Sequence, residues 1–208
     1  KQDNRRIMSG IISDNQGRSS GLVKAAAAGG GAWNLVLAQT ISSNVGEVEF
    51  TDSHFTSTYD FYKVVIISGV PEDENDRQLR MRLSYGGSYV TAAEYDWGYS
   101  GLHEGDHNRG GDDSGTSFYI TGDDYNVGGN NGESFNAEVT IYNPLSTDSD
   151  KLVTATTAFT TDLVVGMRTD FMGRLNDSDG DALDAFKFYM NSGDIISGSF
   201  ILYGLSKS

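Results

Sequence analysis

The best candidate for a metal site is a run of alternating carboxylates: Asp177, Asp179, Asp181 and, further on, Asp184. Carboxylates spaced in this way along a turn can bring hard oxygen ligands together around Ca²⁺. The run departs from an EF-hand loop, which has Gly at its sixth position and Glu at its twelfth, because here Gly180 comes fourth and Phe188 twelfth. We therefore expect a solvated Asp/Gly hairpin loop, keep Ca²⁺ as the alternative, and expect no other cofactor.

Residues for acid–base or nucleophilic catalysis are present, but their spacing does not favour an enzyme. Two acid pairs, Asp112-Asp113 and Asp123-Asp124, could supply the two carboxyl groups of a glycosidase, but adjacent Asp residues in Gly-rich segments are usually solvated. His103 and His107 have a spacing that aligns ligands only on a helix, and this context does not favour one. With no cysteine and no Gly-x-Ser-x-Gly turn, we expect a non-enzymatic protein.

An aromatic stripe, Tyr95, Trp97 and Tyr99, alternates along one predicted strand just before the acidic segment. If its rings are exposed, they could stack on sugar rings and form a glycan platform. If they face inward, they pack in the core. Core packing is the expectation, and glycan contact is the alternative.

Composition predicts one β-rich domain. The 208 residues include 26 Gly and only 2 Pro, a balance that favours many short strands joined by glycine turns. The net charge of −14 repels phosphate backbones and anionic lipid, so we expect neither nucleic acid nor membrane as a partner. We see no apolar run of about 18 residues and no leader, so we expect no membrane span and no secretory signal.

Period-2 alternation begins at Trp33 and recurs along the chain. The run 62–68 is apolar on both faces, as in a central strand. Segments 103–115 and 122–132 are rich in Gly, Asp and Asn and are predicted to be long exposed loops. The pattern predicts an all-β fold, a jelly-roll-like antiparallel β-sandwich with an extended N-terminal arm. The other predicted strands are 33–38, 79–85, 135–142, 152–159, 163–168, 185–190 and 195–203.

The strand predicted at 79–85 has one apolar face and one basic face. Arg80 and Arg82 lie on the basic side. They face either solvent or a neighbouring copy, whose acidic loops they could pair with.

The first 32 residues differ from the rest. Five basic and two acidic residues give them a net charge of +3, which leaves −17 for residues 33–208. They show no strand alternation, and their Gly and Ser content suits an extended tether. We therefore expect residues 1–32 to be a basic docking arm and residues 33–208 a single β-sandwich domain.

Several segments resemble a known group of proteins. The stretch 12–25, Trp33-Asn34-Leu35, the stretch 57–62, Tyr142-Asn143-Pro144 and the stretch 192–204 are similar to landmarks of small virion structural proteins of marine tailed bacteriophages. The resemblance brings no catalytic residues with it. It implies a protein on the virion surface that is tied to the capsid or tail by its arm, through Ile12, Asp14, Asn15, Gly17, Arg18, Gly21, Leu22, Val23 and Lys24.

Three functions remain open at this point. The leading expectation is capsid decoration, in which the partners are other virion proteins and further copies of this chain. A tail-fibre or adsorption protein would instead bind host glycans. The third is a free carbohydrate-binding β-sandwich module. An enzyme such as a glycan depolymerase is a weaker alternative, because it rests only on the abundance of Asp.

Overall fold

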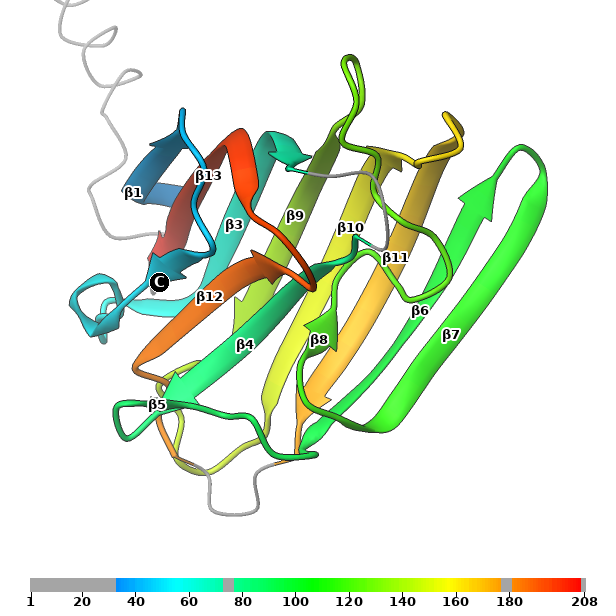
Figure 1. The fold of residues 1–208 in the computed structure, drawn as a ribbon. Helices are drawn as coiled ribbons and strands as arrows, with labels where there is room; N and C mark the ends of the chain where they lie inside the picture. The colour runs from blue at the N-terminus through cyan, green and yellow to red at the C-terminus, as the bar shows by residue number, and fades with distance from the viewer. Residues whose placement is uncertain (1–32, 73–76, 177–180, 207–208) are drawn as a thin grey trace, which may run out of the picture.

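The structure, a computed structural model, describes residues 33–72, 77–176 and 181–206. These residues form two antiparallel β-sheets that pack together around one hydrophobic core (Figure 1). The predicted all-β sandwich is therefore confirmed. The predicted docking arm lies outside the described residues.

The large sheet has eight strands and the small sheet five. In spatial order the large sheet consists of β1 (Trp33–Ile41), β13 (Ile195–Ser206), β3 (Tyr59–Pro71), β9 (Phe135–Tyr142), β10 (Lys151–Thr160), β11 (Gly166–Leu175), β6 (Tyr95–His103) and β7 (Asp106–Gly115). The small sheet consists of β2 (Val48–Phe50), β12 (Ala185–Met190), β4 (Leu79–Tyr85) and β5 (Ser88–Tyr89), with β8 (Phe118–Tyr119) paired to β4. A short 3₁₀ segment, η1 (Asp52–His54), follows β2. Within the described ranges, no helix is long and apolar enough to cross a membrane.

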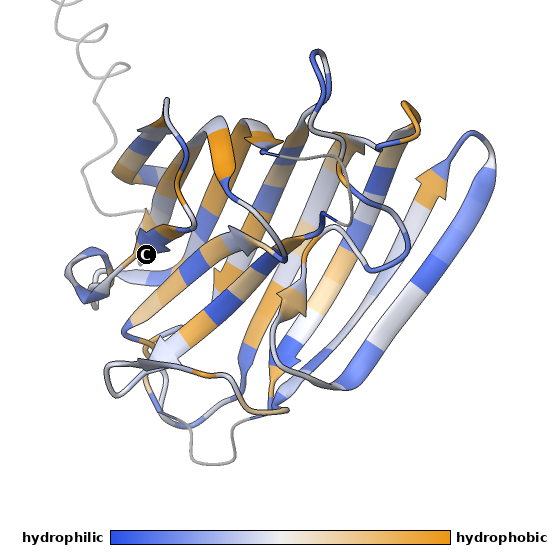
Figure 2. Cartoon of the chain, viewed as in Figure 1, coloured by the Kyte–Doolittle hydropathy of each residue, from blue (hydrophilic) through white to orange (hydrophobic). Residues whose placement is uncertain are grey.

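The core forms because apolar side chains alternate along the strands and point to the space between the sheets. In β9, Phe135, Val139 and Ile141 are fully buried, whereas the alternate residues Asn136, Glu138 and Thr140 are not. Leu79 and Met81 of β4 are buried from the small-sheet side. Figure 2 shows hydrophobic and hydrophilic residues alternating along these strands. Each such buried side chain contributes about 1.5–3 kcal/mol to stability.

Most predicted strands are confirmed, and one begins later than expected. β9 and β12 have the predicted bounds, and β3 is a central strand between β13 and β9. The strand predicted at 163–168 instead begins at Gly166. Leu163 and Val164 lie in the turn after β10. In this turn the Thr161 N–H donates to the Val165 carbonyl at 2.8 Å. Val164 has a φ of 62°, which lies outside the β region of backbone conformation.

The loop predicted at 103–115 is wrong, because residues 106–115 form the edge strand β7. Two glycines allow this strand to lie close to β6 despite its polar composition. A Cβ at Gly111 would lie 2.5 Å from the Trp97 carbonyl oxygen, and one at Gly110 would lie 2.7 Å from the Tyr99 ring. Segment 122–132 contains no strand, as predicted, but it is not exposed throughout, because Val127 is fully buried in the core.

Candidate binding face of the large sheet

The large sheet turns one whole face away from the small sheet. We call this the outer face. Of the nine large apolar side chains that are exposed among the described residues, seven lie on it, and the other two are Leu163 and Val164 in the β10–β11 turn. The seven are Trp33, Leu35, Ile67, Leu102, Tyr142, Leu152 and Met172. Such a concentration of exposed apolar groups on one face is typical of an interaction surface.

Strand register places most of these side chains next to one another. One row runs across five neighbouring strands, and each of its residues is paired with the next. In order, the row consists of Trp33, Leu205, Phe61, Tyr142 and Leu152. In the adjacent row, Leu35 and Met172 occupy the same face. We call the following six residues the apolar band: Trp33, Leu35, Phe61, Tyr142, Leu152 and Met172.

Aromatic contacts give the apolar band a defined geometry. The Trp33 and Phe61 rings meet edge to face at 5.5 Å between centroids, and the Phe61 and Tyr142 rings are 5.8 Å apart. The Lys63 Nζ lies 5.3 Å from the Trp33 ring centroid and forms an ion pair with Glu138 at 2.9 Å. These contacts hold the rings in place while leaving Trp33 42% exposed and Leu35 62% exposed.

An open trough adjoins the apolar band where β11, β6 and β7 run side by side. Gly98 and Gly111 are opposite each other in the ladder, and with no side chains there the trough has a volume of about 730 Å³. Leu152 and Met172 line its apolar side. Asp112 and Asp113 line the other side.

Arg174 also lines the trough and forms ion pairs with two carboxylates. Its guanidinium donates to Asp96 Oδ2 from Nη2 at 2.5 Å and lies 3.3 Å from Asp150 Oδ2. The hydrogen bond to Asp96 is the main reason that the pKa of Arg174 is raised. The trough therefore offers an Arg–carboxylate cluster beside exposed apolar groups.

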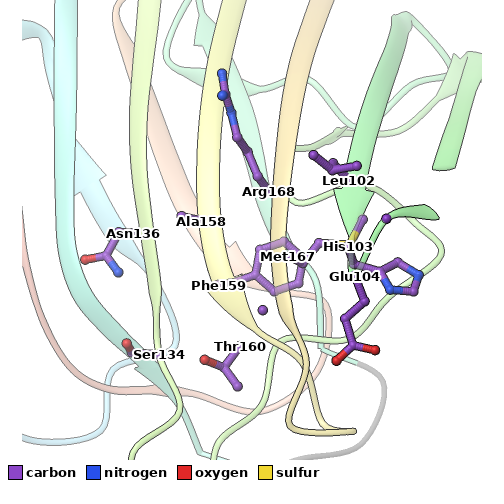
Figure 3. A pocket seen from close by; sticks show the side chains of 12 residues that line it. Leu102, His103, Glu104, Ser134, Asn136, Ala158, Phe159, Thr160, Met167 and Arg168 are labelled. Carbon is purple, nitrogen blue, oxygen red and sulfur yellow. The ribbon is translucent and has the colours of Figure 1, made fainter. Parts of the chain in front are cut away.

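A second, polar hollow of about 540 Å³ lies at the end of the outer face (Figure 3). Ser134, Asn136 and Thr160 contribute polar side chains from one side of it, and Glu104 lines it from the β6–β7 turn. Arg168 of β11 also lines it, but its guanidinium points away, toward Asp170 at 3.0 Å. Hydroxyl, amide and charged groups of this kind can hydrogen-bond a polar ligand.

The aromatic stripe is part of the core. Tyr95, Trp97 and Tyr99 are at most 7% exposed, and the Trp97 ring stacks on Tyr119 at 4.8 Å between centroids. The Tyr95 hydroxyl accepts from the Leu83 N–H at 3.0 Å, and burial raises the pKa of Tyr95. The three rings therefore do not form the exposed platform that sugar stacking requires.

The paired acids and the histidines do not converge on one another. Tyr99 donates to Asp124 at 2.6 Å, so the second acid pair lies over the inner side of β6, whereas Asp112 accepts from its own neighbour Ser114. His103 contacts the Tyr125 hydroxyl at 2.5 Å, while His107 is exposed on the adjacent strand opposite Leu102. This arrangement does not supply a nucleophile with a neighbouring base.

The predicted metal run is described only in part. Asp177 and Asp179 lie outside the described residues, and Asp181 is exposed. Asp184 accepts hydrogen bonds from the Ser84 hydroxyl and the Gly87 N–H, both at 2.5 Å, and so braces the β4–β5 turn. Within the part of the chain that the structure describes, no three His, Asp or Glu side chains gather as a metal site would need.

The outer face was not identified from the sequence, and the predicted arm residues between Ile12 and Lys24 cannot be placed on it, since they lie outside the described ranges. Its apolar residues come from six different strands, so only the strand register brings them together.

Comparison of the chain with family models, with curated proteins and with solved structures finds no match.

Proposed function

We propose that this chain is a non-enzymatic structural protein of a bacteriophage virion. Its β-sandwich is displayed on the particle surface and docks onto other virion proteins, most directly as a capsid decoration protein. The observation that carries the proposal is the apolar band on the outer face. An exposed apolar surface of this kind is costly to leave in water and is typical of protein–protein contact sites.

The edge of the large sheet supports the same role. β1 is an edge strand of nine residues that contains no charged residue and no proline. Edge strands that are not meant to pair usually carry charges, prolines or bulges. β1 does have one register shift, between Leu35 and Leu37, but its backbone and its apolar side chains are otherwise open to a partner. This strand also directly follows the basic segment 1–32, so the arm and the apolar band can engage one partner together.

Binding to particles tests the proposal. Leu35→Glu and Met172→Glu each place a carboxylate within the apolar band at a side chain that is more than 60% exposed, so folding is preserved. Leu163→Glu is the matched control, because Leu163 is 71% exposed but lies in the β10–β11 turn.

Each protein is incubated with virus particles that lack this chain, and bound copies per particle are counted. We expect saturable binding by the wild type and Leu163→Glu and weak binding by the two band variants. Equal binding by all four proteins would refute docking through the apolar band. Hundreds of copies per particle indicate decoration, and a few indicate a tail appendage.

Glycan binding by a tail-fibre protein or a free module is the second candidate. The trough favours it, because Gly98 leaves room for a ring beside Met172 and the carboxylates of Asp96 and Asp112. A glycan array on which the wild type binds and Gly98→Leu does not would favour this function. Silence of the wild type would exclude the glycans on the array.

A further inference from the structure

Two half-buried cations on the outward side of the small sheet have no carboxylate partner among the described residues. The Arg80 guanidinium carbon lies 3.9 Å from the Tyr119 ring centroid, and that of Arg82 lies 5.1 Å from the Tyr189 ring centroid. Among the described residues neither Arg forms an ion pair, whereas Lys63, Arg168, Arg174 and Lys187 all do. We call Arg80, Arg82, Tyr119 and Tyr189 the basic face.

Residues of this type are suited to binding another protein. Arg and Tyr are enriched at the energetic centres of interfaces. Stacking on a tyrosine ring fixes the planar guanidinium, so less side-chain freedom is lost when it binds a carboxylate. Arg82 is further fixed because its Nε donates to the Thr116 carbonyl at 3.2 Å.

The opposite charge is concentrated at the edge of the large sheet. Residues 104–124, from the β6–β7 turn to the loop after β8, contain six acids and one basic residue, Arg109, and none of the six forms an ion pair among the described residues. All six side chains are exposed. We call them the acidic edge: Glu104, Asp106, Asp112, Asp113, Asp123 and Asp124.

We infer that copies of this chain associate head to tail, with the basic face of one copy against the acidic edge of the next. The two surfaces belong to different sheets, since the basic face is centred on β4 in the front layer of Figure 1 and the acidic edge on β7 at its right-hand side. The contact is therefore heterologous, and each copy retains one free surface of each sign. Repetition of this contact gives a ring or an open array.

The charge distribution favours a second copy as the occupant of the basic face. The net charge of −14 keeps copies apart in general, but this repulsion is screened beyond about 8–10 Å at physiological salt. At contact distance the local pairing of Arg80 and Arg82 with unpaired carboxylates dominates and selects one orientation. The acids that the arginines require are already present on every copy.

This inference deepens the proposed function, on which it rests, because a decoration protein acts as many adjoining copies. Self-association is measured with the purified full chain, and particle binding is measured separately. A chain that binds particles without associating in solution or on the particle would refute only the head-to-tail contact. A chain that associates but does not bind particles would refute only the virion role.

The test is a charge swap read by sedimentation velocity at low and high ionic strength. One variant carries Arg80→Glu and Arg82→Glu, and the other carries Asp112→Arg and Asp113→Arg. We expect concentration-dependent oligomers for the wild type, weaker at high salt. We expect an apparent dissociation constant at least about tenfold higher for either variant alone.

The decisive sample is the equimolar mixture of the two variants. Each variant there meets a complementary surface only on the other, so we expect the mixture to recover the association that each lost. Ser42→Glu is the control and should associate like the wild type, because Ser42 is exposed directly after β1, at the edge of the large sheet opposite β7. Arg82→Glu alone replaces the first variant if circular dichroism shows that the double change prevents folding.

Three results would overturn the inference: a wild type that stays monomeric at every concentration, charge-reversed variants that associate normally, or a mixture that fails to recover association. Binding of the wild type to an acidic polysaccharide through Arg80 and Arg82, with no self-association, would assign the basic face to that ligand instead.

Discussion

Replacing Trp97 with Ala tests whether the aromatic stripe is part of the core. The Trp97 side chain is 7% exposed, stacks on Tyr119 at an interplanar angle of 17°, and lies 6.3 Å from the Phe171 ring centroid. Removing a buried Trp costs about 3–5 kcal/mol through lost burial and the cavity that remains. For a domain of this size each kcal/mol lowers the Tm by about 2–4 °C. We therefore expect the Tm to fall by roughly 6–20 °C.

Trp97→Phe separates ring packing from the polar atom. The buried Trp97 Nε1 has no hydrogen-bond partner among the described residues, and a buried unsatisfied donor costs about 1–3 kcal/mol. Phe keeps a ring and removes that donor, so Trp97→Phe should lose much less stability than Trp97→Ala.

The assay is urea unfolding followed by far-ultraviolet circular dichroism, which does not depend on tryptophan emission. Trp33→Ala is the matched control, because Trp33 is the other tryptophan of the chain and is 42% exposed on the outer face. A Trp97→Ala variant that loses no more stability than Trp33→Ala would refute the assignment of the stripe to the core.

Three further predictions concern groups that the structure places individually. Burial, and next the hydrogen bond to Asp124, raises the pKa of Tyr99 above its usual 10.0. The stabilisation by the neutral Tyr99 side chain is therefore complete below pH 10 and is lost as the pH rises further. The free energy of unfolding should fall less steeply with rising alkaline pH in Tyr99→Phe than in the wild type. Gly98→Ala should hardly change stability, because its Cβ would meet only a carbonyl oxygen at 3.5 Å. Gly111→Ala should cost about 1–3 kcal/mol of stability by overpacking. Thermal melts of the two variants check this, and equal stability would contradict it. Asp184→Ala should lower the free energy of unfolding in urea by about 1.5–3 kcal/mol, because two hydrogen bonds to the carboxylate are removed. The loss should be the same with and without added calcium. A loss seen only with calcium present would instead indicate that Asp184 is a metal ligand.

Strands with regular alternation could be predicted from the sequence because burial on one face determines their pattern. Residues 135–142 alternate between apolar and polar types, and the structure buries the apolar set. The same reasoning predicted β12 and the start of β1. It did not predict β7, because a strand rich in Gly and Asp has no apolar face and is held by its backbone ladder with β6.

The candidate site was harder to predict because it depends on tertiary register. Alternation placed Tyr95, Trp97 and Tyr99 on one side of a strand, but only the complete sandwich determines that this side faces inward. The outer face likewise contains one or two exposed large apolar residues from each of six strands. Such residues are unremarkable singly, and the structure alone brings Trp33 and Leu152 onto the same row.

Oxidation of Met172 on intact virions tests the central claim most directly. Met172 is 63% exposed within the apolar band, whereas the other methionines of the described residues, Met81, Met167 and Met190, are at most 4% exposed. Dilute peroxide should therefore convert Met172 to its sulfoxide before Met81, Met167 and Met190 in the free chain, and mass spectrometry reports the rate at each position. The account predicts that this chain is found in purified virions and that Met172 is strongly protected there. Absence of the chain from virions, or oxidation of Met172 on virions as fast as in the free chain, would contradict it.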